Sequence, residues 1–348
     1  MQTFALMSKT TLFDIARKLK INPATVSRAL NNHPRISAKT KALVVGVAGE
    51  LNYRPNRVAT SLQSGKSYII GVMIPSADIN FFGSVVHGIE SIASTFGYNI
   101  IIYQSNESTA YEQKGLQTFI ETSVDGIIAS IAKETTDFSH YNEIKLKNIP
   151  LVLFDRGTNK LDVSSVVIDD FNGAFMATEH LIKQGYNRIA HISGPQHIKI
   201  FEDRLMGYRK ALSIYNYPFH SALVEHGDIS IEAGINAAKK LLSVPNPPDA
   251  IFAVEDFTAL GAIKVLKENG IKIPDEFGIV GFANELFGAH ITPSLSTIDQ
   301  QTIKMGKEAF KLLLSLINQK ETTDRVKTAM VLEAIPVFRE SSLRNALI

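Results

Sequence analysis

Residues 11–31 read TLFDIARKLKINPATVSRALN. The spacing predicts a first helix that follows Thr11, a possible N-cap, and carries apolar residues at helical intervals: Leu12, Ile15, Ala16 and Leu19. Asn22 is a good N-cap for a second helix, and Pro23 suits its first position, where a missing N–H costs nothing. The stretch therefore predicts two short helices joined by a tight turn.

The second helix, 23–30, is expected to bury Val26, Ala29 and Leu30. Its other face then shows small and polar side chains: Ala24, Thr25, Ser27 and Arg28. A third helix is expected over 37–51, softened by Gly46 and Gly49. This is the helix-turn-helix plan, in which the start of the second helix meets base edges in the major groove of DNA.

The net charge of +2 hides a strong asymmetry along the chain. Residues 1–66 hold 11 lysine and arginine side chains and two carboxylates, a net charge of +9, whereas the remaining 282 residues carry −7. A basic head on an acidic body is expected of a nucleic-acid-binding module fused to another domain. A solvated basic surface without a partner is the alternative.

The segment after the third helix reads NYRPNRVATSLQSGK, residues 52–66. Asn56 can cap a short helix that runs to about Gln63, and Gly65 can end it. Eight residues are too few for a stable helix alone in water, so we expect this segment to order only when something holds it.

The head resembles the lactose-repressor (LacI/GalR) family of bacterial transcription regulators. The resemblance rests on TLFDIA (11–16), ATVSRALN (24–31), YRPN (53–56) and ATSL (59–62). It implies a homodimer on a pseudo-palindromic operator in double-stranded DNA, with hinge helices that fold on the DNA. The DNA-contacting residues expected from the pattern and the resemblance are Thr11, Pro23, Ala24, Thr25, Ser27, Arg28, Asn31, Asn56, Arg57, Ala59 and Leu62.

Two of these residues have alternative roles. The resemblance implies that Leu62 is a wedge in the minor groove, and an apolar wedge does unstack and kink a base step. An ordinary linker leucine is the other interpretation. Arg28 can read a base edge or merely contact a phosphate.

From Tyr68 onward, short apolar runs alternate with helical patterns. Strands are expected at 68–74, 99–103, 126–131, 151–154, 166–168, 188–192, 250–254 and 277–281, with two short ones near 330–337. Helices are expected at 82–96, 111–122, 141–147, 174–184, 202–215, 231–242, 257–268 and 302–318. This alternation predicts an α/β body of parallel sheets flanked by helices.

Several function classes find no support in the sequence. There are no cysteines, no apolar run of about 20 residues, no glycine-rich phosphate loop and no catalytic triad pattern. Nine scattered histidines lack metal-ligand spacing, and His191 and His197 are interpreted as core or loop residues. We therefore expect no enzyme activity, cofactor, metal site or membrane association. The start of the chain lacks a signal-peptide pattern, which predicts a cytoplasmic protein.

The body resembles the periplasmic-binding-protein-like type I sensor domain of the same family. The marks include Phe81-Phe82, Asp155-Arg156, Gly194-Pro195 followed by Arg204, and TPSLSTIDQ at 292–300. The resemblance implies two lobes joined by three crossings, with an effector in the cleft between them. Open parallel sheets also bind ligands at the carboxyl ends of their strands, where most of these residues are expected.

The expected effector is a sugar or sugar derivative, with phenylalanine rings against its apolar face and polar groups at its hydroxyls. The candidate contacts are Phe81, Phe82, Asp155, Arg156, Arg204, Ile229, Glu255, Asp256, Asn284 and Gln300. Phe81 and Phe82 can instead be lobe core, Arg204 can brace its helix, and Asp256 can cap the next helix.

Departures from the family pattern bear on the effector. Ala283 stands where many members have an aspartate, and Ile198, Ile200 and Ile229 make the pocket more apolar than a simple hexose needs. A purine is disfavoured. A modified sugar, a sugar phosphate and a uronic acid stay open, since two arginines could hold an anion.

The sequence thus predicts a DNA-binding transcription regulator, a repressor controlled by a small effector. The expected domains are a helix-turn-helix head at 1–54, a hinge at 55–66 and a body at 67–348. The expected N-lobe comprises 67–166 and 296–328, and the C-lobe 167–292 and 329–340. The rivals are a sugar-binding transport receptor with an incidental basic head and an enzyme on the same scaffold.

Overall fold

The computed structural model describes residues 10–53, 65–319 and 327–344. The chain divides into two compact units, residues 1–67 and residues 68–348. Four predicted DNA contacts lie outside the described residues, as does most of the predicted hinge: Asn56, Arg57, Ala59 and Leu62.

The described residues 10–53 of the first unit form a three-helix bundle of α1 (Leu12–Leu19), α2 (Pro23–Leu30) and α3 (Ala38–Glu50). The caps form as the sequence predicts for α2, where the Asn22 side chain accepts a hydrogen bond from the Ala24 N–H at 2.8 Å. Ser37 caps α3 in the same way. The buried core consists of Ile15, Ala16, Val26, Ala29, Val44 and Ala48.

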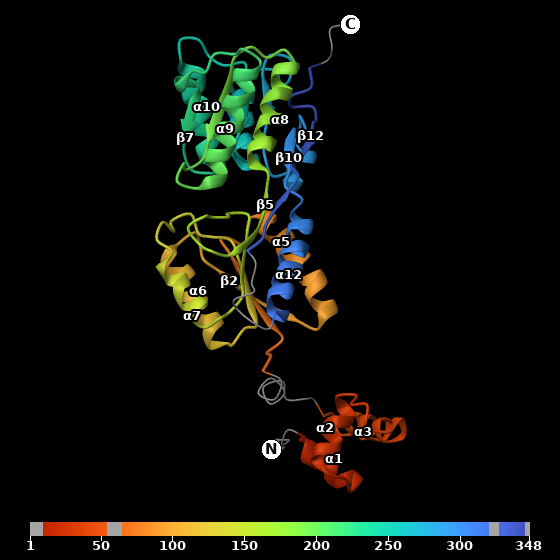
Figure 1. Ribbon diagram of the computed structural model, residues 1–348. Coiled ribbons are helices and arrows are strands. Elements are labelled where there is room, and N and C mark those ends of the chain that lie inside the picture. Colours follow the sequence, from red (N-terminus) through yellow and green to blue (C-terminus); the bar gives the residue numbers. More distant parts are fainter. Residues whose placement is uncertain (1–9, 54–64, 320–326, 345–348) are drawn as a thin grey trace, which may run out of the picture. The chain divides into compact units, whose positions relative to one another are not determined.

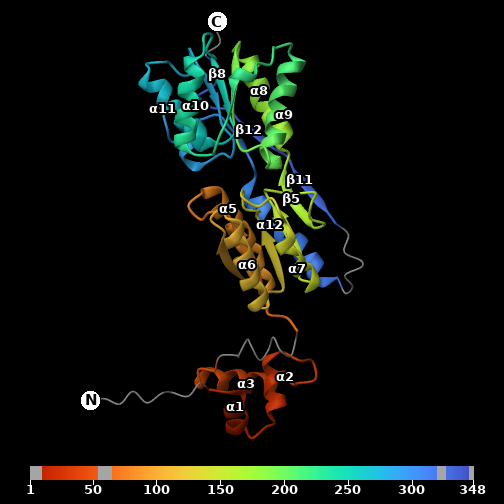
Figure 2. The ribbon, with the colours of Figure 1, turned by 90° about the vertical axis from the view of Figure 1, so that its left-hand side faces the viewer.

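The first lobe of the second unit is built on a six-stranded parallel sheet of order β11-β5-β4-β3-β1-β2 (Figure 1). The strands are β1 (Ile69–Ile74), β2 (Asn99–Gln104), β3 (Gly126–Ala129), β4 (Leu151–Phe154), β5 (Ser164–Ile168) and β11 (Ala329–Leu332). Its helices are α5 (Asn80–Ala93), α6 (Thr109–Glu121), α7 (Asn142–Leu146) and α12 (Thr302–Asn318). Helices α5 and α12 pack side by side (Figures 1 and 2).

The second lobe has a four-stranded parallel sheet of order β7-β6-β8-β9. Its strands are β6 (Ile189–Ser193), β7 (Val224–His226), β8 (Ala250–Ala253) and β9 (Gly278–Val280). Its helices are α8 (Asp170–Lys183), α9 (Lys199–Ile214), α10 (Ile231–Ser243) and α11 (Asp256–Glu268). Strands β10 (Thr297–Asp299) and β12 (Ile335–Val337) pair antiparallel beside this lobe.

The chain crosses between the lobes after β5, after β10 and after β11, so the three implied crossings are present. Two details of the predicted lobe boundaries are wrong. Strand β11 pairs with β5 and so belongs to the first lobe, although residues 329–340 were expected in the second. Strand β10 was expected in the first lobe, yet it pairs with β12, and Ser296 and Asp299 bridge to residues at and after β9.

Candidate functional site

The outer face of α2 carries the residues predicted to read DNA. Ala24, Arg28 and Asn31 are exposed and follow one another at helical spacing, whereas Val26 and Ala29 are buried. Pro23, Thr25 and Ser27 are half-buried at the margins of this face. Thr11 is exposed, but its hydroxyl donates a 2.7 Å hydrogen bond to Asp14, so it also fixes the start of α1.

The charge distribution of the head favours this face. Within residues 10–53 the carboxylates are Asp14 and Glu50, which pair with Arg17 and Lys18 at 3.7 and 2.6 Å. The hydrogen bonds from Thr11 lower the pKa of Asp14 and keep it ionised. No carboxylate in that described range pairs with Arg28, which leaves its guanidinium for an external anion or base.

The second unit has a cavity of about 70 Å³ between its lobes. It lies beyond the carboxyl ends of parallel strands, where ligands bind in open α/β sheets. Eight of the ten predicted effector contacts line it: Phe81, Phe82, Asp155, Arg156, Arg204, Ile229, Glu255 and Gln300. The lining also includes Ile79, Ile200, Phe201, Phe257 and Ala283. Of these, Ile79, Phe201 and Phe257 were missed, although Phe201 and Phe257 lie in the first turn of helices that follow buried strands.

Arg156 is held from behind by a residue that sequence reasoning missed. Its two terminal nitrogens donate to the two oxygens of Glu107 at 2.6 and 2.8 Å, and one of them also donates to the Ile131 carbonyl. Burial raises the pKa of Glu107, but the hydrogen bonds and charge of Arg156 outweigh it and leave the pKa lowered. The charge of Arg156 is therefore balanced before any ligand arrives.

Arg204 is balanced in the same way. Its Nε and Nη2 contact Asp170 at 2.8 Å, and its Nη1 donates to the Val254 carbonyl at 2.6 Å. The guanidinium carbon also lies 3.6 Å from the centre of the Phe282 ring. Burial raises the pKa of Asp170 to about 7, against the opposing effect of Arg204. Arg204 thus braces its lobe and lines the cavity.

Glu255, not Asp256, caps the helix that follows β8. The Glu255 carboxyl accepts from the Phe257 N–H at 2.7 Å, and burial raises its pKa to about 8. Asp256 is fully buried and lies away from the cavity, where it accepts from the Thr297 hydroxyl and the Glu285 N–H at 2.7 Å each. Gly281 leaves room for this carboxylate, because a Cβ there would collide with it.

Asn284 also lies outside the cavity lining. Its amide nitrogen donates to Asp299 and its oxygen accepts from Arg339, both at 2.8 Å. Asp256 and Asn284 therefore hold the strand segments behind the cavity in place.

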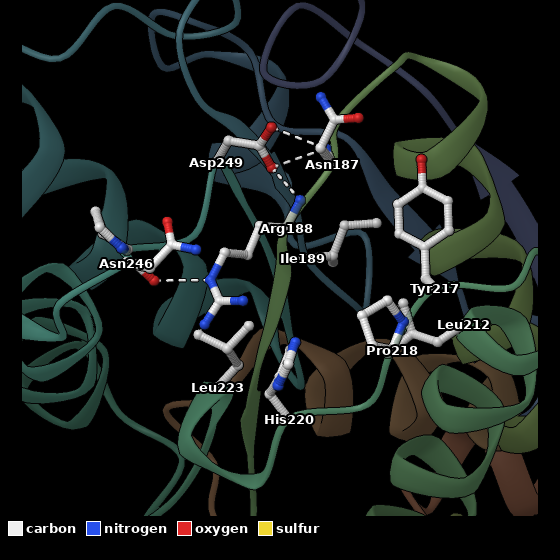
Figure 3. A pocket seen from close by; sticks show the side chains of 11 residues that line it. Asn187, Arg188, Ile189, Leu212, Tyr217, Pro218, His220, Leu223, Asn246 and Asp249 are labelled. Atoms are coloured by element: carbon white, nitrogen blue, oxygen red, sulfur yellow. Dashed lines mark hydrogen bonds between the residues drawn. The ribbon is translucent and has the colours of Figure 1, made fainter.

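A second, wider hollow of about 440 Å³ lies at the opposite end of the second lobe (Figure 3). It is found at the amino ends of β6 and β8, where Arg188 donates to the Asn246 carbonyl at 2.7 Å and Asp249 accepts from the Asn187 and Arg188 N–H groups. Parallel sheets bind ligands at the other ends of their strands, so the inter-lobe cavity is the better effector site.

Among the described residues no group of histidine, aspartate and glutamate side chains could hold a metal ion. His191 is buried between Tyr208 and Phe252, and its Nδ1 lies 2.9 Å from the Phe252 carbonyl oxygen, so it is a core residue. In the described part of the chain no helix combines the length and apolar character needed to cross a bilayer.

Two family models match the two units. Residues 11–56 match "Bacterial regulatory proteins, lacI family", and residues 67–335 match "Periplasmic binding proteins and sugar binding domain of LacI family". The chain belongs to the LacI family. It is a DNA-binding transcription regulator with a sugar-sensor body, and the matched head disfavours the transport-receptor alternative.

Individual LacI-family members cover nearly the whole chain. The ribose operon repressor of Halalkalibacterium halodurans is 35% identical over 311 residues, which are 89% of this chain and 91% of that protein. Catabolite control protein A of Priestia megaterium is 34% identical over 315 residues, 90% and 94% of the two chains. The Lac repressor dimer bound to operator and an anti-inducer superposes with a TM-score of 0.86 at 26% identity, covering 97% and 100%.

Proposed function

We propose that this LacI-family chain is a repressor that binds a pseudo-palindromic operator as a homodimer. A small sugar-derived effector in the inter-lobe cleft either lowers or raises the affinity of the protein for the operator. The proposed DNA binding rests on the exposed α2 face, which consists of Ala24, Arg28 and Asn31, and on the net charge of +9 of the head. Several relatives are named as repressors, and one solved relative is a dimer on its operator. A regulator of DNA acts in the cytoplasm.

Two exposed apolar side chains support a dimer. Strand β2 is an edge of the six-stranded sheet, and Ile102 on it is 49% exposed. Leu286, in the 3-10 turn Leu286–Ala289 of the second lobe, is 68% exposed. Edge strands are normally covered, and a second copy of the chain supplies a symmetric cover.

The cleft residues take their roles from their chemistry. We assign Phe81 and Phe82 to the apolar face of the sugar, and Asp155, Arg156, Glu255 and Gln300 to its hydroxyls. Ile229 and Arg204 complete the wall, whereas Asp256 and Asn284 act as positioning residues. The hinge residues Asn56, Arg57, Ala59 and Leu62 keep their proposed DNA roles, which the described residues do not test.

Selection of bound duplexes from a random pool, followed by footprinting, tests the proposal. A protected two-fold-symmetric site of two half-sites is expected, with affinity that falls steeply as salt rises. A thermal-shift screen of sugars should then find a ligand, which at 100 times its dissociation constant adds about 2.7 kcal/mol of stability. Failure to protect any symmetric site at low salt would refute the regulator assignment.

A further inference from the structure

The wall of the cleft is more apolar than a free sugar requires. Eight of the thirteen lining residues are apolar: Ile79, Phe81, Phe82, Ile200, Phe201, Ile229, Phe257 and Ala283. In the second lobe Ile198, Ile200, Phe201 and Val254 form an apolar cluster of their own with Ile229, separate from the main core of that lobe. A free hexose has hydroxyl groups around its ring, and an apolar cluster cannot satisfy them.

The guanidinium groups of the cleft are already occupied. Glu107 takes both terminal nitrogens of Arg156, and Asp170 together with the Val254 carbonyl takes those of Arg204. Two further carboxyl groups, Asp155 and Glu255, line the cavity. Burial raises the pKa of both, which shows how poorly this site accepts negative charge. A phosphate or carboxylate ligand would therefore find no unpaired arginine in the cavity and would bring an uncompensated charge into a buried site.

The size of the cavity adds a constraint. About 70 Å³ is well below the roughly 300–1,000 Å³ of typical ligand pockets. The lobes or the lining side chains must move apart before any sugar fits, and the walls that then separate are largely apolar. When the walls separate, their apolar side chains lose hydrophobic stabilisation. An apolar group of the ligand that packs between them restores it.

From these observations we infer that the effector is an uncharged glycoside with an apolar aglycone, and not a free sugar, a uronic acid or a sugar phosphate. This inference rests on one part of the proposed function, namely that a sugar-type ligand binds in the cleft. The sugar ring lies against Phe81 and Phe82 near Asp155 and Gln300, and the aglycone lies against the second-lobe cluster around Ile229.

Calorimetric titration of the full chain tests the inference. The probes are glucose, galactose, xylose and ribose, the phenyl β-glycoside of each, and the glucose and galactose uronic acids and 6-phosphates. At least one phenyl glycoside should bind tenfold or more tightly than its parent sugar, about the gain expected from burying a small apolar group, and every anion should bind more weakly than its neutral parent. A parent sugar that binds as well as its glycoside, an anion that binds best, or no bound glycoside at all would overturn the inference.

A matched pair of variants locates the aglycone. Ile229→Asn should weaken the bound glycoside about tenfold and leave the parent sugar within twofold. Ile231→Asn, two residues away with its side chain 40% exposed, should change neither. Equal affinity of the Ile229→Asn variant and the wild type for the glycoside would contradict the placement. Glycoside binding by a chain that protects no DNA site would refute the proposed regulator but leave this inference standing.

Discussion

Glu255 is a residue whose protonation links the cleft to stability. Burial raises its pKa to about 8 from an ordinary value of 4.5. Between these values the folded state holds a proton that the unfolded state has lost, so the Glu255 contribution to stability falls as pH rises from about 5 to about 8. The same proton lets the carboxyl donate a hydrogen bond to a ligand at neutral pH.

Glu255→Gln should therefore stabilise the protein increasingly toward high pH. The amide keeps the acceptor for the Phe257 N–H and cannot ionise. The gain should be near zero at pH 5 and about 1–3 kcal/mol at pH 8. Urea unfolding of both proteins at several pH values measures it. Stability curves that stay parallel from pH 5 to pH 8 would show that Glu255 does not ionise in this range.

Arg28 is the residue of α2 that we propose reads a base edge of the operator. Arg28→Ala should weaken operator binding by about 1–3 kcal/mol and relax the preference at one base pair of each half-site. Arg35→Ala, an exposed arginine beyond α2, is the matched control and should weaken all sequences alike. Binding selections with each variant separate the two effects. A uniform loss with Arg28→Ala would identify a phosphate contact.

Position directly after a buried strand predicted some of the residues that line the cavity, and it misplaced others. Asp155-Arg156 and Glu255 were found because polar pairs directly after buried strands have few structural uses. Asp256 and Asn284 satisfy the same pattern, but they turn to Thr297, Asp299 and Arg339, partners more than ten residues away in sequence. Glu107 was missed because its role arises only from its tertiary contact with Arg156.

At the scale of elements, continuous apolar strands were predicted within a few residues and polar edge strands were not. Strand β7 has the sequence Val-Glu-His and only partly buried side chains, so it has no apolar run to detect. Strand β10 is three residues long. Strand β11 belongs to the first lobe because, after α12, the chain pairs again with β5 of that sheet. The hydrophobic pattern of a strand does not show which sheet it joins.

Helix α3 carries two glycines, which lower its intrinsic helical preference. Gly46 and Gly49 are exposed, and a Cβ at either position would meet no atom within 4 Å. Gly46→Ala should therefore stabilise α3 by about 0.5–1 kcal/mol through lower entropy of the unfolded chain. Slower amide hydrogen exchange across Ala38–Glu50 in the full chain is the expected signal.

The control for this prediction is Gly97→Ala in the body. That position has equal open space but a φ of +76°, where a Cβ is strained, so its substitution should destabilise. If Gly46→Ala accelerated amide exchange in α3, the entropy of the unfolded chain would not be the reason that these glycines destabilise the helix.

At the scale of the whole molecule, we propose that the response to an effector depends on an equilibrium between lobe arrangements. An effector shifts that equilibrium only by its differential affinity for the two states. Lys133 of the first lobe contacts the second lobe twice: its Nζ lies 2.8 Å from Asp228, and its carbonyl accepts from His197 Nε2 at 2.7 Å. The Lys133 N–H donates to Glu107, the same carboxylate that holds Arg156. Glu107 thus holds both the residue that contacts the second lobe, Lys133, and the residue that lines the cavity, Arg156.

Lys133→Met should therefore favour the open arrangement of the lobes. The Lys133–Asp228 pair is partly exposed, and such a pair contributes up to about 1 kcal/mol, so the open-to-closed ratio should rise about two- to fivefold. Because the chain has no cysteine, Lys114→Cys and Lys239→Cys introduce unique dye sites on α6 and α10 for single-molecule energy transfer. Raising salt from 0.05 to 1 M should open the wild type in the same direction, since it screens a pair that solvent reaches.

Two further variants make the measurement decisive. Lys145→Met, an exposed lysine on α7 of the same lobe, should leave the distribution of lobe distances unchanged. The charge exchange Lys133→Asp with Asp228→Lys should bring it back toward the wild-type distribution, because the pair re-forms with opposite polarity. If Lys133→Met and Lys145→Met gave the same distribution at low salt, closure would depend on other contacts between the lobes, and the Lys133–Asp228 ion pair would have no part in setting the resting state of the sensor.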